Sequence, residues 1–82
     1  MHTSSHSLAV ALELMQGWIG LAEGQYKATV CLFAQQLPAG EVLDAVQITM
    51  AKFPEGGRDA LRYFCGVCHW KIRGRRLRLR WN

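Results

Sequence analysis

The chain has 82 residues, half of them apolar, and a formal net charge of +4 at pH 7. This length accommodates one small domain with a single compact core and excludes a multidomain protein. No apolar run approaches the roughly 18–20 residues of a membrane span. The first residues lack the basic segment of a secretory signal peptide, and Glu13 interrupts their apolar stretch. We therefore expect a cytoplasmic protein without a membrane partner.

Two helices are predicted in the first half of the chain. Strong helix formers fill residues 8–16, and a serine at position 4, 5 or 7 can cap that helix. In residues 25–37, apolar side chains recur at steps of four, three and four. These side chains are Tyr26, Val30, Phe33 and Leu37. The spacing is that of one helical face, and Pro38 ends the helix because the residue before a proline avoids helical geometry.

Two more helices are predicted in the second half. A third helix fits residues 40–53, with a shared apolar face that Val42 and Thr49 widen. That face consists of Leu43, Val46, Met50 and Phe53. Pro54 and two glycines then mark a turn. A fourth helix fits residues 58–73, with Gly74 as its C-terminal cap because glycine tolerates the left-handed conformation found there.

The predicted helices define the fold class. Short turns between four helices predict an all-α protein, a small bundle of about four helices. Residues 75–82 alternate charged and apolar side chains, which is a strand pattern, but no second strand is predicted to pair with it. We expect residues 1–74 to form a single helical domain and residues 75–82 to form a basic C-terminal arm, extended until a partner orders it.

The charge is divided unevenly along the chain. Residues 1–57 carry two basic and five acidic side chains, whereas residues 58–82 carry eight basic side chains and one acidic side chain. Such asymmetry indicates an end that binds a polyanion. The alternative is a solubilising tail, but such tails usually lack the tryptophan and leucine that alternate with the charges here.

The sequence CGVCH at residues 65–69 has the spacing by which c-type haem is attached, and paired cysteines also serve zinc or redox chemistry. Advancing 100° per residue along the fourth helix places Cys65 and Cys68 on its core stripe near Leu61. His69 falls on another side, with the arginines. Free cysteine packs as a small apolar residue. We therefore expect the cysteines to fill the core and expect no cofactor.

Haem, zinc and redox chemistry remain alternatives. Haem attachment needs export from the cytoplasm, and the candidate axial partners of His69 all lie upstream, at His2, His6, Met15 and Met50. Zinc would need Cys31 as a fourth ligand, and the adjacent Cys68 and His69 diverge by 100° on a helix. A redox pair of the thioredoxin type needs a strand before the helix, and none is predicted.

Residues 41–75 contain two segments with a characteristic spacing. The first segment has Ala45, Ile48 and Ala51, and the second has Tyr63, Gly66 and Val67. In this spacing the two segments resemble the two helices of the C-terminal helical module of the DnaD-type replication-initiation proteins of bacteria and phages. The tryptophan position of the family falls on Lys71, and Trp70 lies one residue earlier. The resemblance implies a helical DNA-binding module of a replication protein, such as one encoded by a phage or another mobile element.

The leading hypothesis is a small nucleic-acid-binding protein, with DNA favoured. The last helix would present a basic face of Arg62, His69, Lys71 and Arg73. The arm would add Arg75, Arg76, Arg78, Arg80 and Trp81. Arginine makes forked contacts to phosphate oxygens. Trp81, and also Trp70 if it is not packed, would stack on unpaired bases, which favours single-stranded or junction substrates.

The alternative hypothesis is a protein-interaction module encoded by a phage or plasmid. Such a regulator, comparable to an anti-CRISPR inhibitor, would dock its basic arm on an acidic surface of a larger replication or defence complex. An enzyme is not expected. The sequence contains no paired carboxylates beside a histidine, no glycine-rich phosphate loop and no Ser-His-Asp set that the helices would bring together. The pattern leaves the oligomeric state open.

Overall fold

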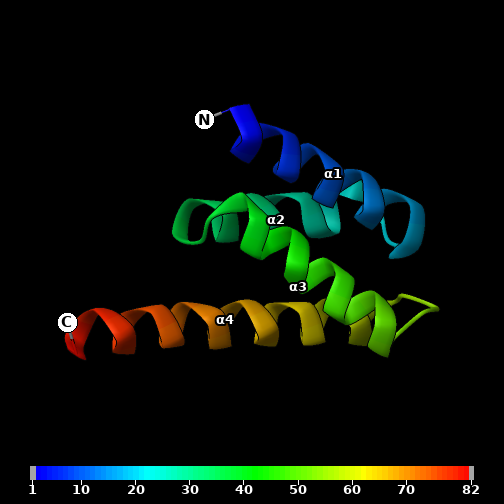
Figure 1. Cartoon of the computed structure of the whole chain (residues 1–82). Helices are drawn as coiled ribbons and strands as arrows, with labels where there is room; N and C mark the ends of the chain where they lie inside the picture. Colours follow the sequence, from blue (N-terminus) through cyan, green and yellow to red (C-terminus); the bar gives the residue numbers. More distant parts are fainter. Residues whose placement is uncertain (1, 82) are drawn as a thin grey trace.

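The computed structural model describes the backbone of residues 2–81 and the side chains of residues 7–74. Four helices follow one another: α1 (His2–Trp18), α2 (Glu23–Gln36), α3 (Ala39–Lys52) and α4 (Arg58–Trp81) (Figure 1). Within residues 2–81 there is no strand. The predicted all-α bundle is therefore confirmed. In this part of the chain, no helix is both long enough and apolar enough to span a membrane.

α3 is the central helix of the bundle. It packs against α1, α2 and α4, and Figure 1 shows it running between α1 and α4. Its buried residues are Ala39, Val42, Ala45, Val46 and Thr49. The prediction for this helix was partly wrong, because Leu43, Met50 and Phe53 are only half-buried beside that face. A helix with three neighbours buries the small side chains that let those neighbours approach closely.

The remaining core comes from the other three helices and the residues that flank them. It consists of Ala11, Met15, Ile19, Tyr26, Val30, Phe33, Leu37, Ala60, Phe64 and Cys68. All four residues of the stripe predicted for α2 are at most 6% exposed, which confirms that prediction. The rings of Phe33 and Phe64 meet edge to face, with centroids 5.9 Å apart. This contact fixes the inner face of α4 against α2.

Two helix ends differ from the prediction. α1 already begins at His2, so the serines at positions 4, 5 and 7 lie inside the helix and the predicted cap was wrong. α4 continues past Gly74 to Trp81, so the predicted cap and the extended backbone after it were also wrong. A glycine inside a helix costs only about 1 kcal/mol relative to alanine, and the arginines and leucines around it favour a helix. The side chains of residues 75–82 lie outside the described set, so their role as a basic arm stays a prediction.

The loop before α4 is fastened to the end of α1. The amide of Gly57 donates to the carbonyl oxygen of Ile19 over 2.7 Å, and the indole Nε1 of Trp18 donates to the carbonyl oxygen of Phe53 over 2.8 Å. Gly56 has a φ of +72°, and a Cβ added to it would lie 2.4 Å from the carbonyl oxygen of Trp18. Only glycine fits there. These bonds set the position at which α4 leaves the turn.

Candidate nucleic-acid interface

α4 presents one fully outward side to solvent. With 100° per residue, five exposed positions fall within 40° of the direction of Gly66, opposite the buried Phe64 and Cys68. We call these five positions the outer stripe. Its members are Asp59, Arg62, Gly66, Trp70 and Arg73. Two arginines and a tryptophan thus share one accessible face of the helix.

Trp70 is the most exposed large apolar residue of the described set. It is 72% exposed, although its neighbours on the inner face of α4 are buried. The sequence left open whether this indole is packed, and the structure places it on the outer stripe. An indole that contributes so little to the core remains available to a partner.

Two hollows flank Trp70, and Gly66 borders both. The first is an apolar groove of about 630 Å³ between α3 and α4, with Asp59 and Arg62 at its rim. Its walls are Ile48, Phe53, Tyr63, Val67 and Trp70. The rings of Phe53 and Tyr63 lie 5.3 Å apart within it. The second hollow, of about 620 Å³, is lined by polar groups that include Gln36, His69 and Arg73. Because Gly66 has no side chain, both hollows stay open beside the indole.

The basic residues of α4 fall into two groups. Arg62, His69 and Arg73 are exposed as predicted, and no ion pair among the described side chains involves either arginine. The ring of His69 rests edge-on against Phe33, with centroids 5.2 Å apart. This contact holds the imidazole at the boundary between α2 and α4. The structure thus brings together three of the four residues predicted for the basic face.

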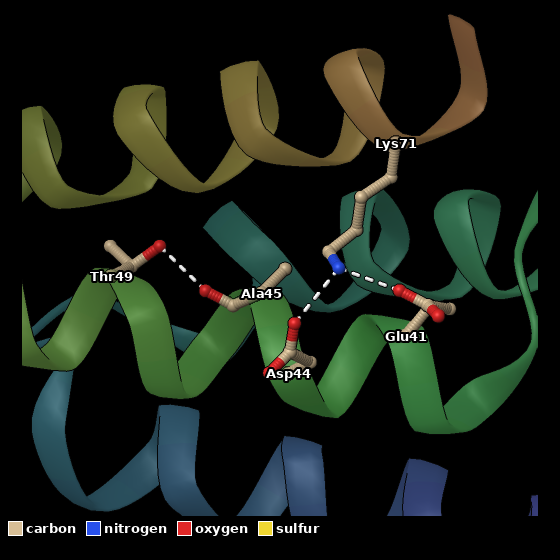
Figure 2. A network of polar contacts seen from close by, with 5 residues as sticks. All are labelled: Glu41, Asp44, Ala45, Thr49 and Lys71. Carbon is tan, nitrogen blue, oxygen red and sulfur yellow. Dashed lines mark hydrogen bonds and ion pairs between the residues drawn. The ribbon is translucent and has the colours of Figure 1, made fainter. Parts of the chain in front are cut away.

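Lys71 is the exception, because it turns toward α3. Its Nζ lies 2.6 Å from Glu41 Oε1 and 2.8 Å from Asp44 Oδ2, and its side chain is 11% exposed (Figure 2). Burial alone would lower the pKa of Lys71, but hydrogen bonds and charge from Asp44 and Glu41 outweigh burial and raise it. Its charge is therefore neutralised inside the domain. This removes Lys71 from the interface that the sequence predicted.

Figure 2 also shows how the same stretch of α3 satisfies a buried hydroxyl. Thr49 Oγ1 donates to the carbonyl oxygen of Ala45 over 2.8 Å, one turn from the acidic pair. A buried hydroxyl without a partner would destabilise the fold. The hydroxyl of Thr49 and the carboxylates of Glu41 and Asp44 therefore all have polar partners.

The cysteines belong to the packing of the domain. Cys68 is fully buried, and Cys65 is half-buried beside it, which confirms their predicted place on the core stripe. Burial raises the pKa of the Cys65 thiol, and burial together with the nearby Cys65 raises that of Cys68 to about 12. Such thiols are poor nucleophiles at neutral pH. Among the described residues, no group of three or more metal-binding side chains is close enough to hold an ion.

The predicted residues of the arm lie on the continuation of α4. Their helical backbone is described, but their side chains are not. They are Arg75, Arg76, Arg78, Arg80 and Trp81. The continuous helix carries them onward from Arg73. Their contribution to the interface stays a prediction.

Comparison with protein-family models, curated proteins and solved structures yields no match. The resemblance of residues 41–75 to the DnaD-type module therefore stays a prediction.

The sequence contained a signal for two features, the inward direction of Lys71 and the outward direction of Trp70. At 100° per residue, Lys71 lies 160–180° from Arg62, His69 and Arg73 around the helix axis, so it could not share their face. Trp70 lies 160° from the buried Cys68, which signals an outward indole. The angles were informative, but the basic side chain of Lys71 led to its place in the predicted basic face, and the packing of Trp70 was left open.

Proposed function

We propose that this protein binds nucleic acid through the outward side of α4, with DNA as the favoured ligand. The observation that carries the proposal is the position of Trp70, 72% exposed, between Arg62 and Arg73, neither of which forms an ion pair with any side chain of residues 7–74. An aromatic platform between cations suits a ligand that has both flat bases and a charged backbone.

Each part of this surface has a distinct role in the proposal. Arg62 and Arg73 contact phosphate oxygens through forked, charge-assisted hydrogen bonds, which supply affinity with little sequence information. His69 adds a donor at the edge of the second hollow. Lys71 has no role, because two carboxylates already hold its ammonium group. The arginines of residues 75–80 extend the phosphate contacts along the same helix.

The exposed indole favours single strands over duplex. In a duplex the bases are already stacked on one another, whereas an unpaired base presents a free face to Trp70. The open space above Gly66 lets a base lie flat beside the indole, because no side chain occupies that position. The predicted second platform at Trp81 would act in the same way.

The test is a fluorescence-anisotropy titration of single-stranded and duplex DNA at several salt concentrations. If most of the six arginines from Arg62 to Arg80 contact phosphate, the logarithm of affinity should fall with log salt at a slope of roughly −4 to −5. Replacing both Arg62 and Arg73 with alanine should make the slope shallower by about 1.5. Trp70→Ala should leave the slope unchanged and weaken single-strand binding by about 1–3 kcal/mol, with a smaller effect on duplex.

Lys71→Met provides the matched control. It removes one positive charge from the same helix, but from its inner side, so the salt slope should not change. Absence of binding to both DNA forms at low salt would contradict the proposal. The proposal would also be contradicted if Lys71→Met reduced the salt slope as much as Arg62→Ala or Arg73→Ala does. In that case only the net charge of the protein would matter, and not the position of the arginines.

A second candidate function is docking on an acidic protein surface within a larger complex. The apolar groove beside Arg62 supports it, because exposed Ile48 and Tyr63 are typical of protein contacts. This candidate predicts that DNA binding is absent while a protein partner is retained.

A further inference from the structure

We infer that the outer stripe of α4 is also a self-association surface, on which two copies of this chain pair antiparallel about a two-fold axis at Gly66. The stripe is exposed along its whole length, and an apolar groove borders it. This inference does not depend on the proposed function.

The spacing of the stripe is symmetric about Gly66. Asp59 lies seven residues before it and Arg73 lies seven residues after it; Arg62 lies four before it and Trp70 four after it. In an antiparallel pair with a two-fold axis at Gly66, each position before the glycine faces the equivalent position after it on the second copy. The two halves of the stripe therefore meet each other.

The charges on the two halves are complementary in this arrangement. Asp59 faces the partner's Arg73, and this ion pair occurs twice because of the symmetry. Arg62 faces the partner's Trp70, a cation–π pair that also occurs twice. A parallel pair would instead place Asp59 against the partner's Asp59 and Arg73 against the partner's Arg73. Repulsion between like charges thus selects the antiparallel orientation.

The apolar groove between α3 and α4 offers a contact surface for the exposed indole of Trp70 in the dimer. In the antiparallel pair, the partner's Trp70 meets Arg62, which lines the same groove as Ile48 and Tyr63. Each large aromatic side chain buries roughly 150–250 Å². Trp70, 72% exposed, can bury most of such an area, whereas Tyr63, 37% exposed, adds much less, so two copies of each account for part of a small interface. We expect a weak dimer that forms at micromolar concentration.

Gly66 is suited to the point where the helices cross. A Cβ at this position would meet nothing within 4 Å inside one copy, so the monomer does not require glycine there. Without a side chain, the two helix backbones can approach closely at the axis. A long side chain at this position would hold the helices apart and leave the monomer intact.

The shared residues connect the dimer to nucleic-acid binding. If the proposed function holds, Arg62, Trp70 and Arg73 cannot serve the partner and a DNA strand at once. Self-association then competes with ligand binding, and a single strand should dissociate the dimer. This competition rests on the proposed function, whereas the dimer itself does not.

The decisive experiment is sedimentation velocity without nucleic acid, from low to high micromolar concentration. Wild type should shift from monomer to dimer. Asp59→Arg and Arg73→Asp should each weaken self-association by about tenfold or more, since each places like charges opposite one another. The double exchange D59R/R73D should restore the dimer. A mixture of the two single variants should form a heterodimer, in which both ion pairs are complementary.

Matched controls separate contact from net charge. Glu13→Arg on α1 and Lys27→Glu on α2 change the charge by the same amounts at exposed positions away from the stripe, and they should leave the dimer unchanged. Gly66→Gln provides a second test if a charge variant fails to fold. It should raise the thermal stability of the monomer and abolish the dimer.

The outcomes are separable. A chain that stays monomeric at every concentration overturns the inference, and so does a dimer that tolerates Gly66→Gln or whose affinity the charge exchange does not restore. A dimer that persists with added single-stranded oligonucleotide, in a protein that shows no DNA binding, overturns the proposed function and leaves the self-association surface standing.

Discussion

Trp70 and Lys71 are neighbours in the chain, yet their environments are the reverse of what their side-chain types suggest. The indole is 72% exposed, whereas the side chain of the lysine is 11% exposed and is held by two carboxylates. One step along α4 turns the side chain by 100°, from the outward side to the side that faces α3. The direction in which each side chain leaves the axis of α4 therefore decides whether the residue faces solvent or α3.

The comparison extends to the whole of α4. Its inner face contains Phe64 and Cys68, which contact the core and stabilise the bundle. Its outer face contains Arg62 and Trp70, which add little to the fold and remain available for binding. Lys71 also lies on the inner face, 20° from Phe64 around the helix axis, where its aliphatic part lies along the domain while its ammonium group reaches Glu41 and Asp44.

The largest expected difference is between two aromatic residues on opposite faces. Phe64→Ala should lower the free energy of unfolding by about 3–5 kcal/mol, because it opens a cavity where the ring is fully buried. Trp70→Ala should change it by no more than about 0.5 kcal/mol. Urea unfolding followed by circular dichroism measures both. Similar losses for the two variants would show that Trp70 packs against the core after all.

A smaller difference is expected between the two cysteines of α4. Cys68→Ala should cost about 1–2 kcal/mol, because the buried sulfur leaves a void, while Cys65→Ala at a half-buried site should cost less. Thermal melting of the two variants shows which loss of stability is larger.

Alkylation should also be slow at Cys68 in the native state, because burial and the nearby Cys65 raise its pKa to about 12. Fast modification of Cys68 at neutral pH would contradict this picture.

A further small loss of stability is expected at Lys71, the charged residue of the inner face. Lys71→Met should cost about 1 kcal/mol, since Glu41 and Asp44 are about half exposed and water can solvate them. The pKa of Lys71 is raised from its usual 10.5, so its stabilisation is fully present below that value. It is lost as pH rises through the higher pKa of the folded state.

The measurement for Lys71 is urea unfolding of wild type and Lys71→Met from neutral to strongly alkaline pH. The difference between the two proteins should be constant at neutral pH and should shrink only above about 10.5. Other groups also ionise there, but they are common to both proteins. A difference that disappears already near neutral pH would show that the ion pairs do not stabilise the fold.

The sequence predicted the helices better than their ends and faces. α2 was predicted well, because one stripe from Tyr26 to Leu37 is buried against one side of the bundle. α3 has neighbours on several sides, so its large residues Leu43 and Met50 lie at the edges of the buried face and Ala45 lies at the centre. The prediction ended α4 too early. The alternating charged and apolar residues after Gly74, and Gly74 itself, indicated a helix end, but the high helix propensity of the arginines and leucines continues α4 to Trp81.

The site was predictable where local geometry decided it. Arg62, His69 and Arg73 share a side of one helix, and their spacing alone placed them together. The partners of Lys71 are 30 and 27 residues away in the chain, so no local pattern indicated them. The groove beside Trp70 also depends on Ile48, which only the packing of α3 against α4 brings near.

The bond between the Gly57 amide and the Ile19 carbonyl has a consequence for how the domain opens. Amides in exposed turns usually exchange with solvent hydrogen rapidly, but this one can exchange only when the end of α1 separates from the turn before α4. The indole of Trp18 reinforces the same junction through Phe53. The first and last helices should therefore unfold as one cooperative unit, although they lie at opposite ends of the chain. Slow exchange at Gly57, matched to that of the core amides of α1, would report this coupling.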